Sequence, residues 1–355
     1  MPDTSSEPHM NHKIVLAARP QGRVRDEHFR EEHAPIPSAS DGEILVRTSM
    51  FSLDPYMRGR MNDGPSYAAP VAIGEVMTAR GIGTVIESKC ADFAAGDTVF
   101  GHTGWQSHCV MRPPAAYAPT AAAAMAPRAL DSAYAPPSTA LGILGMPGLT
   151  AYVGLQVIGA PAAGETVVVS AASGAVGAVV GQLARMRGCR VVGVAGAASK
   201  CDYVVEELGF DACVSHHSAT LAEELRAACP DGIDIYFENV GGKTFEAVLP
   251  QLNTFARIPV CGSIANYNSS SAPSEVNYMA ALQRAMTSKR LHMQGFIVSD
   301  RWDLFEEYHA QMSAWIRAGR AHYKEDIVDG LANAPRAFQG LLAGENFGKL
   351  LIRVS

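Results

Sequence analysis

The sequence lacks several features that would place this protein in other functional classes. No apolar run approaches the roughly 20 residues of a membrane-spanning helix, and no long basic run accompanies the net charge of −6. Neither a membrane nor nucleic acid is therefore the expected partner. The seven cysteines form no CxxC pair, which favours reduced thiols over a disulfide framework. Residues 1–12 are polar and carry no signal-peptide core, so we expect a disordered tail on a cytoplasmic protein.

The chain is long enough and apolar enough for two domains. It has 355 residues, of which 48% are hydrophobic and 18% are charged. Residues 13–134 contain short alternating runs, such as GIGTVIES, separated by Gly, Pro and Asp, and this texture predicts a β-rich domain. Residues 302–319 have an amphipathic helix pattern, and residues 346–354 have a strand pattern that we expect to return to the β-rich domain. We therefore assign residues 13–134 and 299–355 to one domain.

The region between these two segments, residues 135–298, alternates between strand and helix patterns. Apolar runs such as VVVS and RVVGVAG are separated by amphipathic runs such as GAVVGQLARMRG. Such alternation is typical of a parallel sheet with helices on both faces. We therefore predict a doubly wound α/β domain of the Rossmann type.

A glycine-rich turn follows the first strand of this region. Residues 172–177 match the A-x-G-x-x-G form of the dinucleotide-binding fingerprint. Gly174 lets the backbone approach a pyrophosphate, Gly177 lets the next helix lie close to the sheet, and the helix N-terminus attracts phosphates. Tight turns between a strand and a helix also use glycine, but the repeated β-α-β context favours dinucleotide binding here.

The strand pattern at residues 190–196 ends without the acidic residue that is typical of an NAD site. An Asp or Glu there would accept a hydrogen bond from the adenosine ribose, whereas this chain has Gly196 followed by two alanines. Lys200 can reach a 2′-phosphate as a point charge, although it could also be a solvated residue in the first turn of a helix. The absent acid and the present base together predict NADP(H).

The histidines form no convincing metal-binding pattern. His102 and His108 flank Trp105, but no nearby carboxylate or paired cysteine completes a ligand set, so we expect no metal. The adjacent His216 and His217 would face opposite sides of a strand. His216 is a candidate contact for the 2′-phosphate or else an ordinary surface residue. We therefore expect hydride transfer that is assisted by hydrogen bonding.

Six motifs, spread over nearly all of the chain after the tail, resemble those of one enzyme family. They are LDPYMRGRM (53–61), LGMPGLTAY (144–152), SGAVGAVVGQLARMRGCRVVGVAG (173–196), YFENVGG (236–242), CGSIANYN (261–268) and ENFGK (345–349). The chain resembles the zinc-free medium-chain dehydrogenase/reductases that reduce carbon–carbon double bonds. This group includes the prostaglandin/leukotriene reductases, the plant alkenal double-bond reductases and, most closely, the bacterial NADPH-dependent curcumin reductases. The resemblance implies an α/β fold with a GroES-like β-rich domain and a Rossmann domain, NADPH as the cofactor and a homodimer.

The resemblance also implies roles for individual residues. The implied cofactor contacts are Gly174, Ala175, Val176, Gly177, Gly196, Lys200, His216, Asn239, Cys261, Gly262, Ser263, Ile264, Ala265, Asn266, Tyr267, Phe296, Ile297, Val298 and Asn346. Tyr56 and Tyr267 match tyrosines of the substrate pocket, with Tyr267 near the substrate carbonyl. Without the family, each tyrosine could be a packed residue or a loop anchor, and the two asparagines could be ordinary turn residues.

The implied reaction is the NADPH-dependent reduction of the double bond of an enone or enal, with Tyr267 donating a hydrogen bond to the carbonyl oxygen. Where mammalian members carry a tyrosine this chain has His216, so we expect a stronger pH dependence of NADPH affinity. The segment after Tyr267 (NSSSAPSEVNYM), which we expect to border the substrate pocket, lacks the longer proline-rich stretch of the mammalian enzymes, and this argues against a prostaglandin-type substrate. The alternatives are quinone reduction, allylic alcohol oxidation and non-catalytic NADPH binding.

Overall fold

The computed structural model of the chain describes residues 10–113, 126–130, 135–269 and 278–354. The chain divides into two compact units, and each is described by itself. The first unit comprises residues 1–141, 326–345 and 350–355, and the second comprises residues 142–325 and 346–349. The chain thus leaves the first unit and returns to it twice. The sequence analysis expected a single return, with residues 299–355.

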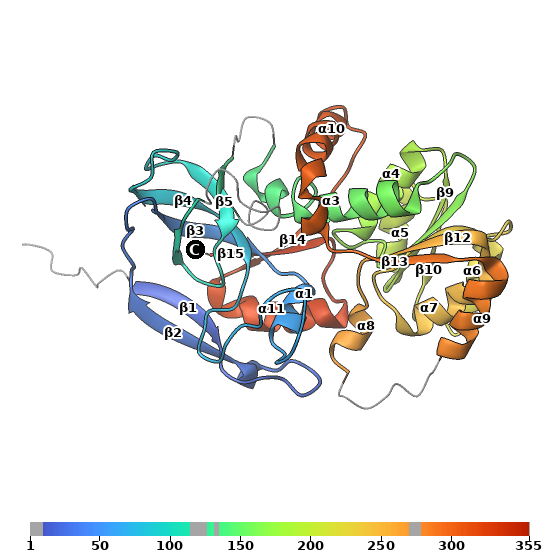
Figure 1. Ribbon diagram of the computed structural model, residues 1–355, viewed down its shortest axis with the longest axis horizontal. Coiled ribbons are helices and arrows are strands. Elements are labelled where there is room, and N and C mark those ends of the chain that lie inside the picture. Colours follow the sequence, from blue (N-terminus) through green and yellow to red (C-terminus); the bar gives the residue numbers. More distant parts are fainter. Residues whose placement is uncertain (1–9, 114–125, 131–134, 270–277, 355) are drawn as a thin grey trace, which may run out of the picture. The chain divides into compact units, whose positions relative to one another are not determined.

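The first unit is built mainly from strands. Its elements are β1 (Met10–Leu16), η1 (Asp26–His28), β2 (Phe29–Pro35), β3 (Ile44–Ser52), α1 (Tyr56–Arg60), β4 (Arg80–Ser88), β5 (Thr98–His102), β6 (His108–Met111), β7 (Arg128–Ala129), η2 (Pro137–Leu141), β14 (Glu325–Asp329), η6 (Leu331–Asn333), α11 (Ala334–Ala343) and β15 (Lys349–Arg353). A seven-stranded sheet has the order β14-β15-β3-β4-β5-β7, with β6 also beside β3, while β1 and β2 form a separate sheet (Figure 1). Trp105 is fully buried in the core of this unit, where its ring packs against those of Phe51 and Phe338.

Strand β1 begins inside the segment that we predicted to be a tail. It pairs with β2 from Met10 onward, and Asn11 is buried. The Asn11 side chain donates to Gln106 Oε1 at 3.0 Å and accepts from the backbone N–H of His108 at 2.9 Å. These polar contacts order a stretch that has no apolar pattern, and residues 1–9 lie outside the described residues.

The second unit alternates strands and helices. Its elements are α3 (Met146–Tyr152), η3 (Val153–Gly159), β8 (Thr166–Ser170), α4 (Gly177–Met186), β9 (Arg190–Ala195), α5 (Ala198–Glu206), β10 (Ala212–Ser215), α6 (Leu221–Ala228), β11 (Ile233–Phe237), α7 (Gly242–Val248), η4 (Leu249–Gln251), β12 (Leu252–Val260), α8 (Ile264–Tyr267), α9 (Met279–Lys289), β13 (His292–Gly295), η5 (Val298–Leu304) and α10 (Phe305–Arg317). The six strands are parallel, in the order β10-β9-β8-β11-β12-β13. Helices α4 and α5 lie on one face of the sheet, and α6, α7 and α9 lie on the other (Figure 1). The prediction of a doubly wound domain is confirmed.

Helix α10 lies in the second unit, although the sequence analysis assigned it to the β-rich domain. The Tyr308 hydroxyl donates a hydrogen bond to the carbonyl oxygen of Ile143, and the Tyr152 hydroxyl donates to Glu307 at 2.8 Å. The rings of Tyr152 and Tyr308 lie 5.5 Å apart. An amphipathic pattern shows that a helix buries one face, but it does not identify the partner that covers this face.

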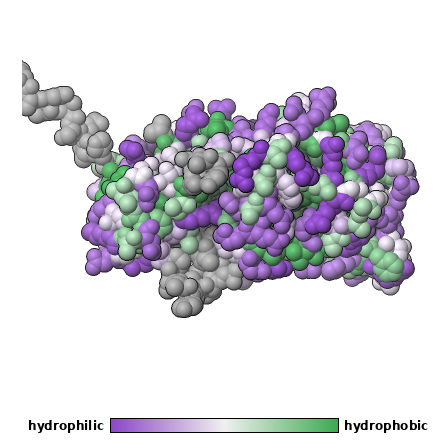
Figure 2. All heavy atoms as spheres, turned by 90° about the horizontal axis from the view of Figure 1, so that it is seen from above, coloured by the Kyte–Doolittle hydropathy of each residue, from purple (hydrophilic) through white to green (hydrophobic). Residues whose placement is uncertain are grey.

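Among the described residues, no helix is long and apolar enough to cross a membrane. On the face shown in Figure 2, hydrophilic and hydrophobic residues are interspersed. The large hydrophobic residues that are exposed, such as Tyr67, Phe255 and Met279, are scattered along the chain. Single exposed residues of this kind are ordinary on a protein surface.

Candidate functional site

The candidate site begins at the centre of the parallel sheet of the second unit. Strand β8 lies between β9 and β11, and the order of the strands reverses at this point. The β8 valines are fully buried, because helices cover both faces of the sheet. Ligands of open α/β sheets bind outside the carboxyl ends of the strands at such a switch point. The predicted phosphate-binding turn follows β8 directly.

The glycines of this turn occupy positions where a side chain would collide with the backbone. A Cβ atom on Gly177 would lie 2.3 Å from the Ala171 carbonyl oxygen, and one on Gly174 would lie 3.1 Å from it. Ala171 itself has a φ of 51°, a left-handed conformation that side chains disfavour. Val176 at the N-cap of α4 makes no side-chain capping hydrogen bond, so no cap side chain competes for the N–H groups of the first turn. The turn is therefore shaped for close approach of an anion.

A hollow within the second unit borders this turn. Its lining includes Gly174, Tyr203, Lys324 and Gly348. The Lys324 ammonium lies 3.9 Å from the centre of the Phe347 ring and 5.2 Å from that of Tyr203. The sequence analysis did not single out Tyr203 or Lys324, and it assigned Lys324 to the other domain.

Asn346 lies in the same segment as Phe347. Its side-chain amide donates a hydrogen bond to the carbonyl oxygen of Gly348 at 2.8 Å, and Gly348 forms an isolated parallel bridge with Gly174. The structure thus brings Asn346 to the phosphate-binding turn. The proposed contact of its side chain with a cofactor stays a prediction.

The corner beyond β9 gathers the residues that we expect to select the cofactor. The Ser215 hydroxyl donates to the Gly196 carbonyl at 2.7 Å, and the Gly196 position faces His216, because a Cβ added there would lie 3.2 Å from the His216 ring. Lys200 lies in the first turn of α5. Partial burial, followed by the nearby charges of His217 and Lys200, lowers the pKa of His216. His216 is therefore neutral at pH 7 and gains a proton most readily beside an anion.

A buried carboxylate, which the sequence analysis did not single out, organises the next loop. Glu238 follows β11, and its Oε1 atom accepts hydrogen bonds from the N–H groups of Val240 and Gly241 at 2.7 and 2.9 Å. The Tyr236 hydroxyl also donates to this oxygen at 3.0 Å. Burial raises the pKa of Glu238, while these hydrogen bonds oppose the increase. The carboxylate fixes the path of the backbone on both sides of Asn239.

Asn239 is held against the end of β8. Its backbone N–H donates to the Ser170 hydroxyl and its side-chain amide donates to the Ser170 carbonyl oxygen, both at 2.8 Å. Ser170 is fully buried. The two hydrogen bonds join the loop after β11 to the start of the phosphate-binding turn.

The loop from Cys261 to Tyr267 packs on the same backbone. The N–H of Cys261 donates to the carbonyl oxygen of Glu238 at 2.9 Å. The N–H of Ile264 donates to the carbonyl oxygen of Asn239 at 3.2 Å. A Cβ on Gly262 would lie 3.0 Å from the Tyr267 hydroxyl, which therefore faces the loop's own backbone. Desolvation raises the pKa of Tyr267, so its phenol stays protonated at neutral pH.

The segment from Phe296 to Val298 follows β13 and is half-buried. The Phe296 ring meets that of Phe237 edge to face, with 6.4 Å between their centres. The structure therefore places Asn239, the Cys261–Tyr267 loop and this segment after the carboxyl ends of β11, β12 and β13. They lie at the same edge of the sheet as the phosphate-binding turn.

Tyr56 belongs to the first unit. It begins helix α1 and is half-buried, and its pKa is raised mainly by desolvation and then by the charge of Asp54. Tyr56 thus retains its proton over the whole physiological range. Its contact with the substrate stays a prediction. The segment between Tyr267 and Tyr278 that we expected to border the pocket lies outside the described residues from position 270 to 277.

The histidines that we considered as metal ligands have other partners. His102 Nε2 lies 2.8 Å from the Thr78 hydroxyl, and His108 Nδ1 lies 3.0 Å from that of Ser107. Burial raises the pKa of the neighbouring Cys109 to about 12, which disfavours a metal-binding thiolate. Within the described ranges, one group of three potential ligands occurs elsewhere, on β1 and β2.

Comparisons with known proteins agree with this architecture. Residues 12–118 match the family described as "N-terminal domain of oxidoreductase", and residues 175–317 match "Zinc-binding dehydrogenase". The NADPH-dependent curcumin reductase of Escherichia coli is 48% identical over 97% of both chains, and the NADP(+)-dependent 2-alkenal reductase of Nicotiana tabacum is 40% identical over 90% of this chain and 89% of its own. The crystal structure of CurA from Vibrio vulnificus in complex with NADPH is 46% identical, with a TM-score of 0.90 over 97% of this chain and 99% of that one. This chain therefore belongs to the medium-chain dehydrogenase/reductases, in the group that contains the curcumin and alkenal reductases.

Proposed function

We propose that the protein reduces the carbon–carbon double bond of α,β-unsaturated ketones and aldehydes with NADPH. The observation that carries this proposal is the corner beyond β9, where Gly196, Lys200 and His216 stand together in place of the acid of an NAD site. Relatives with 48% and 40% identity are named as NADPH-dependent curcumin reductase and 2-alkenal reductase. A cationic corner without an acid favours a 2′-phosphate over a free hydroxyl.

The residues present fit this cofactor. Gly174 and Gly177 leave room for a pyrophosphate at the N-terminus of α4, where no side chain caps the helix. Lys200 and His216 would hold the 2′-phosphate. Asn239 and the loops after β12 and β13 would receive the nicotinamide half, because they lie along the same edge of the sheet.

Tyr267 is the proposed catalytic residue. When bound, NADPH supplies a hydride for the β-carbon of the substrate. The Tyr267 phenol, which is protonated because its pKa is raised, would donate a hydrogen bond to the carbonyl oxygen as negative charge develops there. Such a bond strengthens in the transition state and so raises kcat rather than only lowering KM. A proton that is supplied by water or by a tyrosine then adds to the α-carbon of the enolate, which completes the reduction. We also propose that the Tyr56 phenol contacts the substrate.

The test is NADPH oxidation with curcumin, followed by identification of the product. A saturated ketone, together with much poorer turnover with NADH, is the expected result. An allylic alcohol would place the hydride on the carbonyl carbon and contradict the proposal. Turnover restricted to quinones would favour a quinone reductase, and tight NADPH binding without turnover of any enone or enal would favour a binding protein.

A homodimer is part of the same proposal, because closed two-fold dimers are the commonest assembly of soluble enzymes. Sedimentation velocity of the whole chain measures the assembly directly. A single species with the mass of one chain at micromolar concentration would contradict this part.

A further inference from the structure

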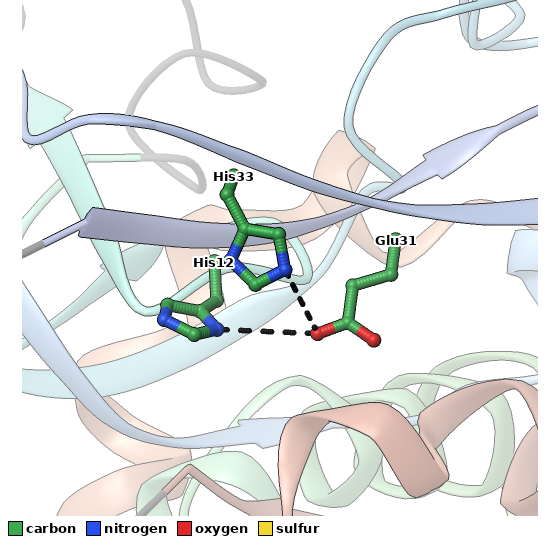
Figure 3. A group of neighbouring side chains, drawn as sticks. All are labelled: His12, Glu31 and His33. Atoms are coloured by element: carbon green, nitrogen blue, oxygen red, sulfur yellow. Dashed lines mark ion pairs between the residues drawn. The ribbon is translucent and has the colours of Figure 1, made fainter.

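The first unit carries a cluster of three potential metal ligands that the proposed reaction does not use. His12 lies on β1, and Glu31 and His33 lie on β2. His12 and His33 are directly opposite each other in the antiparallel register, and Glu31 precedes His33 by two residues. Side chains two apart on a strand share a face, so all three project from one side of the β1-β2 sheet (Figure 3).

The three side chains converge on one point. Glu31 Oε1 lies 3.9 Å from His12 Nδ1 and 3.7 Å from His33 Nε2, and the three potential ligand atoms lie within 4.8 Å of one another. In a tetrahedral site with bonds of about 2.0–2.2 Å, ligand atoms are about 3.3–3.6 Å apart. The cluster therefore needs only small side-chain rotations to reach this spacing, and the register of the two strands can stay unchanged.

The surroundings allow an ion to enter. The side chains of His12, Glu31 and His33 are 49%, 45% and 50% exposed. Their freedom to rotate lets the imidazoles, whose ring centres are 4.3 Å apart, turn their nitrogens towards a shared ion. The remaining coordination position would face water, as in a site with three protein ligands.

The donor set selects the kind of ion. Two imidazole nitrogens and one carboxylate oxygen suit zinc and the other late first-row dications, whereas Mg²⁺ and Ca²⁺ prefer oxygen ligands alone. We propose that His12, Glu31 and His33 form a surface site for a transition-metal dication of the zinc type, which links β1 to β2.

Such a link would add to the contacts that already hold β1. A two-stranded sheet is marginally stable by itself, and β1 also makes backbone hydrogen bonds outside this sheet. The His12 carbonyl oxygen accepts from the N–H of Ser107, and the N–H groups of Ile14 and Leu16 donate to Trp105 and Glu75, all at 2.9 Å. An ion that binds the paired strands and not the unfolded chain raises stability by mass action.

The test is calorimetric titration of the metal-stripped, reduced whole chain with Zn²⁺. Because accessible free thiols also bind zinc, the measured quantity is the difference between the unmodified chain and its variants. We expect His12→Ala and His33→Ala each to weaken one binding event at least about tenfold, since even residues that only support a ligand change metal affinity by that factor. Glu31→Gln, which keeps the size of the side chain, should weaken the same event. A hundredfold excess of Mg²⁺ should not compete.

His292→Ala is the matched control, because His292 is an exposed strand histidine of the second unit that belongs to no such cluster among the described residues. It should leave the binding event intact. Zn²⁺ should also raise the thermal midpoint of the unmodified chain more than that of the His12→Ala/His33→Ala double variant. Equal circular dichroism spectra of all variants show that they are folded.

A second readout reports the site directly. One equivalent of Zn²⁺ should shift the imidazole NMR resonances of His12 and His33 together and leave that of His292 in place. The proposal is overturned if these resonances do not move, or if the double variant binds zinc with the affinity and stoichiometry of the unmodified chain.

Discussion

The two corners of the proposed cofactor site are built in different ways. At the turn after β8, the shape depends on the backbone, because a Cβ on Gly177 would meet the Ala171 carbonyl oxygen at 2.3 Å. At the corner after β9, the surface depends on two partly exposed side chains, the cationic Lys200 and the titratable His216. We therefore expect the first corner to accept any dinucleotide and to matter for folding, and the second to distinguish NADPH from NADH and to add little to stability.

Gly177→Ala should disrupt the phosphate-binding turn after β8. The new methyl group would press on the backbone of Ala171 and Ala172, which cannot move aside cheaply, so we expect a loss of about 1–3 kcal/mol in the free energy of unfolding. Affinity for NADPH and NADH should both fall at least about tenfold, because one charge-assisted hydrogen bond from the turn to a phosphate contributes about 1.5–3 kcal/mol. Thermal denaturation and fluorescence titration measure the two effects.

Gly295→Ala is the matched control for this change. A Cβ at Gly295 would have nothing within 4 Å, so stability and binding should stay close to those of the unmodified protein. If Gly177→Ala bound both cofactors as tightly as its control, the steric account of the first corner would be wrong.

Tyr267→Phe tests the proposed catalytic hydrogen bond, which belongs to neither corner of the cofactor site. Loss of the phenol proton donor should lower kcat about a hundredfold, as for the removal of one oxyanion donor, and leave the Kd for NADPH unchanged. Tyr278→Phe removes a hydroxyl from another tyrosine of the same unit and should leave kcat unchanged. Stopped-flow kinetics and NADPH titration separate the two quantities. A Tyr267→Phe variant with full turnover would remove this phenol from the mechanism.

Lys200→Ala should remove the proposed 2′-phosphate contact at the second corner and leave the phosphate-binding turn intact. A hydrogen bond to a charged group contributes about 1.5–3 kcal/mol, so we expect the Kd for NADPH to rise at least about tenfold while the Kd for NADH stays constant. Arg284→Ala removes one exposed positive charge from α9 in the same unit and controls for long-range attraction. An equal loss of affinity for both cofactors would mean that Lys200 does not contact the 2′-phosphate.

The pH dependence of NADPH binding should also distinguish the two corners. His216 has a lowered pKa in the free protein, and a bound phosphate favours its protonated form. Binding therefore takes up a proton, and the Kd for NADPH should fall as the pH decreases from 8 towards 6. For an exposed ion pair we expect the protonation of His216 to change the Kd for NADPH by about twofold to fivefold over this range. In His216→Ala this part of the pH dependence should disappear. His217→Ala should retain it, and the opposite pattern would transfer the contact to His217.

The sequence predicts features that rest on local patterns. The turn at residues 172–177 is recognisable because the glycine spacing coincides with the change from a strand pattern to a helix pattern. The alternation of strands and helices likewise predicts the doubly wound sheet, which the structure confirms. The roles of Tyr56 and Tyr267 rest on the family resemblance. Those of Lys200 and His216 rest also on the residue pattern after β9, and all four stay predictions.

Features that depend on distant partners could not be predicted. Helix α10 has a clear amphipathic pattern, but only the fold shows that Tyr308 meets Ile143. Glu238 looks like an ordinary polar residue after a strand, although it accepts several hydrogen bonds from its own loop. The meeting of His12 with His33 depends on the register of two strands, and β1 begins with a polar stretch that has no strand pattern.

The position of β15 in the sheet has a consequence for protein synthesis. This last strand lies between β14 and β3 and pairs with the Met50–Ser52 end of β3. On the ribosome, the parallel sheet of the second unit has all its strands once β13 has emerged, whereas the sheet begun earlier stays incomplete until β15 follows. The nascent chain therefore carries an open strand edge through most of its translation, and an edge of this kind can pair with other chains. Synthesis that terminates shortly before residue 349 would therefore give a chain that is prone to aggregation, because the Met50–Ser52 end of β3 would lack its partner strand.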